Sequence, residues 1–238
     1  KHVQLQQATT SNNLANANTN GFKAELVAFR ALPVVADAPA TPTRAFVVDS
    51  TIGHDRTQGP LIHTGNDQDF ALKGAGFFAV QAPDGQEAYT RDGGYVVDEN
   101  GIMRTRSGLA ILSDGGPITV PNNTRVSIGE DGTISAVPIE GGDRASQTLG
   151  QLKLVAEVDR NDFYKGVDGL FRRNDGQDAP RADNVRVTPG AVEGSNVNVV
   201  ESLVQMIDHA RHYDLNIKLM QTADQNGKSA TSIMNLAG

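Results

Sequence analysis

The sequence predicts an α+β protein, in which N- and C-terminal helices pair as a coiled-coil-like hairpin and a central all-β domain is hairpin-rich and barrel-like. Three observations predict this class. Apolar residues recur at intervals of three and four near both ends, short β-branched and aromatic runs separated by Asn-Gly and Asp-Gly fill the middle, and a proline-rich stretch lies between them. We therefore expect a helix with a polar end over residues 1–30, an extended connector over 31–60, the β domain over 61–195 and the C-terminal helix over 196–238.

The N-terminal helix is predicted by a four-and-three spacing shared by Val3, Gln7, Thr10, Leu14 and Ala17. Asn20-Gly21 follows as a stop signal, because glycine readily takes the left-handed conformation that ends many helices, and Phe22 would fold back onto the last turn. Asparagine is a mediocre helix former, yet Asn12, Asn13 and Asn16 lie inside the expected helix. Two interpretations stay open: a solvated helix end, or amides that lie between packed helices and fix their register.

The connector and the β domain are predicted by their turn residues. Each proline of the connector biases the preceding residue toward an extended conformation, and these prolines are Pro33, Pro39, Pro42 and Pro60. Asp-Gly and Asn-Gly tolerate the positive φ angles of tight hairpins. They predict hairpins of strands 77–81 with 87–91, 95–97 with 102–105, and 125–128 with 133–137, followed by further strands at 151–158 and near 184–188.

The C-terminal helix carries more apolar residues than one partner can cover. Asn198 can cap its start, with Glu201 reaching back, and the pattern continues to about Thr222 before weakening at Asp224 and Gly227. A seam with the a/d spacing of coiled coils is formed by Val199, Leu203, Met206, Ala210, Tyr213, Ile217 and Met220. Val204, Leu215 and Leu219 lie off this seam, so we interpret the helix as a joint between molecules.

Composition excludes several functions. The 238 residues carry a formal net charge of −7 and contain no basic run, which argues against nucleic-acid and membrane-surface binding, since both need clustered Lys and Arg. The absence of cysteine removes disulfides, thiolate nucleophiles and Cys-ligated zinc. The sequence contains no run of 18 apolar residues and no recognisable cleavable signal peptide, so we expect no membrane insertion.

No catalytic, cofactor-binding or metal-binding residues are predicted. His209 and His212 share a helix face but lack matching ligands nearby, and Lys73–Phe77 is glycine-rich but opens a strand, where no helix N-terminus could hold a phosphate. The segment 174–178 lacks the closing Glu of a calcium loop and is interpreted as a turn. A Gly-x-Ser-x-Gly elbow is also absent. A secreted enzyme or a β-rich binding module stays an alternative, because catalytic residues can come together only in the fold.

Three segments carry a family resemblance. The run from Asn12 to Asn16, continued through Gly21-Phe22-Lys23, resembles the N-terminal signature of the bacterial flagellar rod, hook and hook-associated axial proteins. Residues 192–198, continued through 221–224, resemble the C-terminal signature, and segments 76–80 and 89–93 resemble the β domain that rod proteins share with the hook. The three motifs occur in the family's order across nearly the whole chain.

The resemblance implies a structural subunit of the flagellar basal-body rod, a torque-transmitting tube across the periplasm. It implies partners among other rod proteins and copies of the chain itself, export through the flagellar type III channel, and terminal segments that become helical on assembly. The connector segments 29–34 and 42–46 resemble a proximal rod protein, with a distal rod or hook-type protein as the alternative. The implied assembly interface combines the helical seam with Leu215, Leu219, Asn12, Asn13, Leu14, Asn16, Gly21 and Phe22.

Overall fold

The computed structural model describes residues 2–33, 45–139, 145–159 and 162–236, and these residues form two compact units. One, here called the helical unit, comprises residues 2–15, 25–33, 45–52 and 198–236. The other, the β unit, comprises residues 16–24 and the described residues of 53–197. The chain is therefore α+β, as predicted, with its two ends in the same unit.

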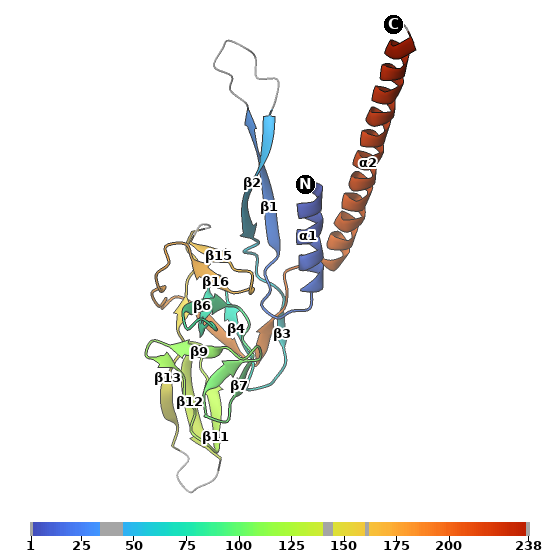
Figure 1. Cartoon of the computed structure of the whole chain (residues 1–238). Coiled ribbons are helices and arrows are strands. Elements are labelled where there is room, and N and C mark those ends of the chain that lie inside the picture. Colours follow the sequence, from blue (N-terminus) through green and yellow to red (C-terminus); the bar gives the residue numbers. More distant parts are fainter. Residues whose placement is uncertain (1, 34–44, 140–144, 160–161, 237–238) are drawn as a thin grey trace. The chain divides into compact units, whose positions relative to one another are not determined.

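The helical unit contains two helices and a two-stranded sheet. Helices α1 (His2–Ala15) and α2 (Val199–Leu236) lie side by side and run in opposite directions (Figure 1). Strands β1 (Glu25–Pro33) and β2 (Ala45–His54) pair with each other. The ring of His2 on α1 contacts the ring of Phe29 on β1 edge-on, with centroids 5.1 Å apart.

The N-terminal helix is shorter than the sequence suggested. It ends at Ala15 rather than at Asn20-Gly21, and residues 25–30 form a strand instead of a polar helix end. The reason is an alternation of period two, in which Val27 and Phe29 are half-buried while Leu26 and Ala28 are exposed. Of the predicted connector over 31–60, residues 31–33 and 45–54 belong to the two paired strands, and residues 55–60 lie in no strand. Pro39 and Pro42 lie outside the described residues.

The C-terminal helix lies within the predicted range of residues 196–238. It continues as a regular helix through Asp224 and Gly227 to Leu236, beyond Thr222, where its apolar pattern weakens. Local interactions compensate for the glycine, which costs only about 1 kcal/mol relative to alanine in a helix. Lys228 Nζ lies 2.7 Å from Asp224 Oδ2, and the hydroxyl of Thr231 donates to the carbonyl of Gly227 at 2.9 Å.

The β unit is built from short strands. They are β3 (Leu61–His63), β4 (Phe70–Lys73), β5 (Phe77–Gln81), β6 (Glu87–Thr90), β7 (Tyr95–Val97), β8 (Met103–Thr105), β9 (Ala110–Ser113), β10 (Gly116–Pro117), β11 (Thr124–Ile128), β12 (Thr133–Pro138), β13 (Gln147–Gln151), β14 (Leu154–Val155), β15 (Phe163–Lys165), β16 (Phe171–Arg173), β17 (Arg186–Pro189) and β18 (Ala191–Glu193). Within the described residues, nine strands form the largest sheet in the order β15-β16-β6-β5-β9-β8-β7, with β10 on β9 and β14 on β5. Smaller sheets are β11-β12-β13, β17-β4 and β18-β3.

The three predicted hairpins are confirmed. Strand β5 pairs with β6, β7 with β8 and β11 with β12, all antiparallel. Their turns contain Gly85, Gly101 and Gly132, with φ angles of 82°, 77° and 82°, in the region that glycine occupies without strain. The barrel-like closure is not found: among the described strands the largest sheet runs openly from β15 to β7, because no ladder joins these two edge strands.

The core lies on both faces of the central strand β5. Phe78 and Val80 belong to one buried cluster with Phe70 and Met103, while Phe77 packs on the other side with Phe171 and other aromatic residues. Successive residues of a strand point to opposite faces, so a continuous apolar run is needed where both faces are covered. No helix in the described part of the chain is long and apolar enough to span a membrane.

Candidate assembly surface

Helix α2 starts with the predicted cap. The side-chain oxygen of Asn198 accepts the backbone N–H of Glu201 at 3.2 Å, which satisfies one of the donors left free at a helix start. The carboxylate of Glu201 does not reach back as predicted, but accepts a hydrogen bond from Gln205, one turn further along the helix, at 3.2 Å. The helix therefore begins at a defined residue of the sequence.

The seam of α2 is only partly covered within the chain. Met206 and Ile217 are half-buried, whereas Val199, Leu203, Ala210, Tyr213 and Met220 are exposed. Among the α2 residues whose side chains are described, only Ser202 is buried. In α1 the buried residues are Thr9 and Thr10. Small hydroxyl side chains, rather than large apolar ones, are therefore the most deeply buried in the two helices, and most of the apolar seam stays accessible.

A second apolar face of α2 is more than half exposed. Val204, Leu215 and Leu219, which the sequence placed off the seam, are 54%, 56% and 67% exposed. Val200 and Ile207 extend this face and are 72% and 53% exposed. Sequence reasoning missed these two residues, although the spacing of four and three from Val200 to Val204 to Ile207 was present in the sequence. We call Val200, Val204, Ile207, Leu215 and Leu219 the outer face of α2.

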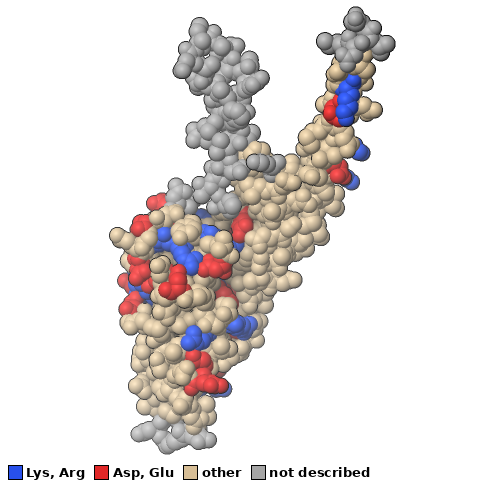
Figure 2. Space-filling model, in the orientation of Figure 1, with Lys and Arg blue, Asp and Glu red and all other residues tan. Residues whose placement is uncertain are grey.

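The two helices differ in charge. Helix α1 contains no Lys, Arg, Asp or Glu. Helix α2 carries exposed charged residues of both signs along its length, namely Glu201, Asp208, Arg211, Asp214, Lys218, Asp224 and Lys228. On the face shown in Figure 2, Lys, Arg, Asp and Glu are dispersed over the β unit with both signs interspersed, and those of α2 are visible toward its end. Neither helix therefore offers a field of one sign.

The asparagines of the N-terminal signature have intrachain partners. The amide of Asn13 donates to the carbonyl of Glu25 at 3.0 Å and accepts the N–H of the same residue at 2.8 Å, as a neighbouring strand would. Asn16 accepts a hydrogen bond from the Thr19 hydroxyl at 3.1 Å. Asn12 is exposed and Leu14 is half-buried. Asn13 therefore joins α1 to the start of β1, a role that neither of the two sequence interpretations contained.

Gly21 and Phe22 lie in the β unit. Gly21 has the expected positive φ, 68°, but stands in a turn six residues beyond the end of α1. A Cβ on this residue would lie 2.4 Å from the carbonyl carbon of Arg91, so only glycine fits. The ring of Phe22, expected to fold back on the helix, lies under Lys165 Nζ, 3.6 Å from the ring centroid. Both residues contact their own chain.

A buried charge cluster lies beside Gly21. It consists of Lys23, Arg91 and Glu193, whose side chains are 2%, 2% and 0% exposed. Burial, and next to it the Arg91 guanidinium, lower the pKa of Lys23 below its ordinary value of 10.5. No local pattern of the sequence predicts this cluster, because its members are far apart along the chain.

The residues considered for catalysis or ligand binding do not form a site. In the described portion of the chain, no group of three His, Cys, Asp or Glu residues could hold a metal. The carbonyl oxygens of Gly74 and Gly76 accept hydrogen bonds from Arg91, so this loop directs carbonyls to a cation rather than N–H groups to a phosphate. In the segment 174–178, interpreted from the sequence as a turn, the carboxylate of Asp175 pairs with the guanidinium of Arg173 at 2.5 Å.

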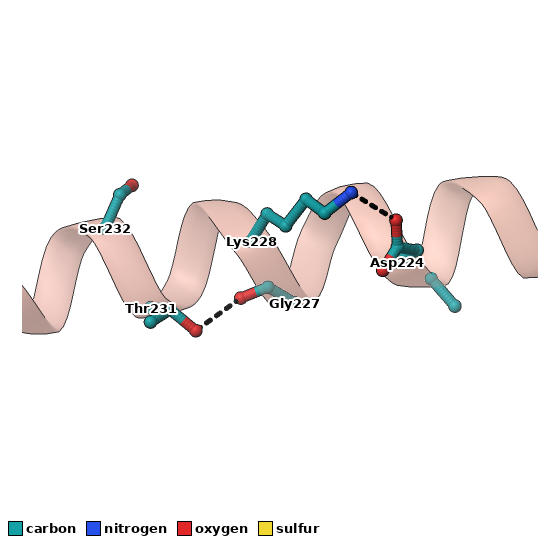
Figure 3. A pocket seen from close by; sticks show the side chains of 6 residues that line it. Asp224, Gly227, Lys228, Thr231 and Ser232 are labelled. Atoms are coloured by element: carbon teal, nitrogen blue, oxygen red, sulfur yellow. Dashed lines mark hydrogen bonds and ion pairs between the residues drawn. The ribbon is translucent and has the colours of Figure 1, made fainter.

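A hollow on α2 has only one wall. Its lining is Ala223, Asp224, Gly227, Lys228, Thr231 and Ser232, all from the same helix. Figure 3 shows these side chains along one helix, with the Asp224–Lys228 ion pair and the Thr231–Gly227 hydrogen bond between neighbouring turns. A depression over a glycine on a single helix cannot surround a ligand, so we assign it no binding role.

Comparisons with known proteins identify the family. Residues 2–23 match the family described as flagella basal body rod protein, residues 71–136 match the flagellar hook protein FlgE/F/G D1 domain, and residues 188–233 match the flagellar basal body rod FlgEFG protein C-terminal family. These segments correspond to α1 with the following turn, to strands β4 to β12, and to β18 with α2. The chain belongs to the flagellar basal-body rod protein family, as the sequence motifs predicted.

Relatives cover nearly the whole chain. The flagellar basal-body rod protein FlgF of Salmonella typhimurium is 40% identical over 98% of this chain and 93% of its own length. FlgF of Caulobacter vibrioides is 36% identical over 92% of this chain and 88% of its own length. FlgG of Buchnera aphidicola (subspecies Acyrthosiphon pisum) is 35% identical over 93% of this chain and 91% of its own length.

Proposed function

We propose that this chain is a structural subunit of the bacterial flagellar basal-body rod, and that it has no enzymatic role. It assembles with other axial proteins and with copies of itself into a tube that transmits torque across the periplasm. The observation that carries this proposal is the outer face of α2, whose five apolar side chains are more than half exposed in the single chain. The family membership agrees with it, since the relatives are named as basal-body rod proteins.

An exposed apolar helix gains free energy when it docks on a partner. Burying one large aliphatic side chain contributes about 1.5–3 kcal/mol, so full coverage of the outer face is worth several kcal/mol to each subunit. Isolated helices are marginal in water, and α2 makes few contacts within the chain along its second half. Neighbouring subunits supply the missing contacts.

We propose that the seam and the outer face serve two different contacts. The seam pairs α2 with helices in the coiled-coil manner, and the outer face meets a second neighbour. A subunit that uses two different surfaces forms head-to-tail contacts, which build tubes and filaments rather than closed dimers. In such a tube the helical unit forms the inner wall. Asn12 and Leu14 of α1 contribute to this contact together with the seam.

The proposal places the chain in the proximal part of the rod. It is supported by the identity of 40% to a FlgF protein, compared with 35% to a FlgG protein over a similar length. Under this proposal the subunit reaches the periplasm through the flagellar type III export channel. A distal rod or hook-type protein is the alternative, and the position of a labelled subunit in purified basal bodies separates the two.

The experiment replaces one residue of the outer face. Leu215→Asp places a charge where we expect a subunit contact, while Asn216→Asp places the same charge on the neighbouring position, which points to a different side of α2. In cells that lack the native gene, we expect Leu215→Asp to prevent rod assembly and swimming, and Asn216→Asp to permit both. Both purified monomers should unfold at the same denaturant concentration as the unaltered chain, because both residues are exposed.

Two results would contradict the proposal. Normal basal bodies and normal swimming with Leu215→Asp would show that the outer face is not an assembly surface and would favour a monomeric binding module. An equal loss of monomer stability and of assembly would make Leu215 an ordinary packing residue. Leu203→Asp combined with Ile217→Asp tests the seam in the same way, with loss of assembly expected and a folded β unit retained.

A further inference from the structure

The carboxylate of Glu193 is shared by three donors from distant parts of the β unit. Its Oε2 atom accepts hydrogen bonds from Arg91 Nε at 2.9 Å and Nη2 at 2.6 Å. Its Oε1 atom accepts from Lys23 Nζ at 2.8 Å and from the backbone N–H of Gly59 at 3.0 Å. One side chain therefore holds three separate segments of the chain at one point.

The backbones around this cluster are paired as well. The N–H of Gly21 donates to the carbonyl of Glu193 at 2.8 Å, and the N–H of Asn196 donates to the carbonyl of Phe22 at 3.3 Å. The side-chain oxygen of Asn196 then accepts the N–H of Ala24 at 2.7 Å. Residues 21–24 and 193–196 thus pair along their length, with the Asn196 amide in place of a backbone carbonyl at the last step.

Close packing leaves the cluster no room to adjust. A Cβ on Gly59 would lie 2.0 Å from the carbonyl oxygen of Gly194, so these two backbones are in direct contact. The side chains of the charged residues are almost completely buried, so water cannot replace a missing partner. Removing one partner of a buried ion pair leaves an uncompensated charge, which is strongly unfavourable. The cluster is therefore stable only when it is complete.

We propose that Lys23, Arg91 and Glu193 form an intrachain clamp that fixes both terminal segments where they leave the β unit, in the free monomer and before any neighbour binds. Glu193 is the positioning residue of this clamp. The clamp gives Gly21 and Phe22 a role within one molecule, so their effect on assembly is indirect. The proposal goes beyond the rod function, because it concerns a property of the single chain.

Backbone hydrogen exchange of the full-length monomer, followed by NMR, tests the clamp residue by residue. In the unaltered chain we expect protection at the N–H groups of Gly21, Ala24 and Asn196. Glu193→Gln keeps the shape of the side chain but removes the carboxylate that both buried cations contact. We expect it to accelerate exchange at these three sites at least tenfold, with little change at Ala79, whose N–H donates to the carbonyl of Lys153 in the largest sheet.

A matched control is Asp67→Asn, which neutralises an acid paired with Arg125 at 3.5 Å in an exposed position, and which should change none of these rates. Unprotected amides at Gly21, Ala24 and Asn196 in the unaltered monomer would overturn the clamp. Equal acceleration at Ala79 would also overturn it, since Glu193 would then act only on global stability.

If Glu193→Gln does not fold, Asn196→Ala provides the same test without a change of charge. It removes the acceptor of the Ala24 N–H, so we expect at least tenfold faster exchange at Ala24 with Ala79 unchanged. Exchange at Ala24 equal to that of the unaltered chain would overturn the proposal. None of these measurements depends on rod assembly, so failure of the clamp and failure of the rod function are distinguishable.

Discussion

The hydroxyl of Tyr89 connects two segments of the β unit and provides a sharp test of its energetics. It donates to Glu87 Oε1 at 2.7 Å and accepts the backbone N–H of Ala179 at 2.6 Å, and the residue is 1% exposed. Tyr89→Phe removes both hydrogen bonds while it keeps the ring, whose centroid lies 5.2 Å from that of Phe163. The substitution therefore isolates the hydroxyl.

The expected loss follows from the partners that remain. The N–H of Ala179 is buried and would have no acceptor, which costs about 1–3 kcal/mol. Glu87 loses less, because Lys153 Nζ stays 2.6 Å from its Oε2 atom. We expect the free energy of unfolding to fall by about 2–3 kcal/mol in total. For a unit of this size, that corresponds to a decrease in melting temperature of roughly 5–10 °C.

Urea unfolding of the monomer at pH 7, followed by far-ultraviolet circular dichroism, measures this loss. The matched control is Tyr164→Phe on β15, where the tyrosine is 42% exposed and the expected change is below about 0.5 kcal/mol. If Tyr89→Phe destabilises the chain by no more than Tyr164→Phe does, the hydroxyl is dispensable and the assignment of these two hydrogen bonds to stability is wrong.

Two further predictions concern pH and helix capping. Burial raises the pKa of Tyr95 to about 12 from its ordinary value of 10.0. Between these two values the folded chain keeps the phenolic proton that the unfolded chain loses, so the free energy of unfolding should fall as the pH rises through this window. In thermal melts between pH 9 and 11.5 we expect a shallower fall for Tyr95→Phe, and an unchanged slope would contradict this prediction. Asn198→Ala removes the cap of α2 and should destabilise the first turn by about 1 kcal/mol, seen as faster hydrogen exchange at Glu201, whereas Asn216→Ala within the helix should not accelerate it.

The sequence allowed the local parts of the fold to be predicted. Asp84-Gly85, Asn100-Gly101 and Asp131-Gly132 each connect strands that lie next to each other in the chain, so the turn residues alone indicate the pairing. The pairs β17-β4 and β18-β3 join strands more than a hundred residues apart, and no local pattern indicates them. The alternation within β1 is short, and Leu26 and Ala28 add apolar residues on its exposed side, so the sequence pattern alone favours helix over residues 25–30.

The candidate assembly surface was also partly predictable, because it depends in part on a local pattern of the sequence. The positions of Leu203, Leu215 and Ile217 on α2 follow from helical periodicity, which is a local property. The clamp could not be predicted, because a Lys, an Arg and a Glu separated along the chain resemble ordinary surface residues until the fold buries them together. The intrachain role of Asn13 depends on where β1 begins, and this start was placed inside a helix.

The contact between Lys23 and Glu193 closes a loop across most of the polypeptide, since the two residues are 170 positions apart. Closing a flexible loop of that length costs about 4–5 kcal/mol of chain entropy, compared with much less for each hairpin. We therefore expect the hairpins to form first and the loop to close late, after their packing has shortened the effective distance. During synthesis on the ribosome, residue 193 emerges only when most of the protein has been made. A growing or truncated polypeptide consequently lacks the contact between Lys23 and Glu193 until almost the entire chain is present.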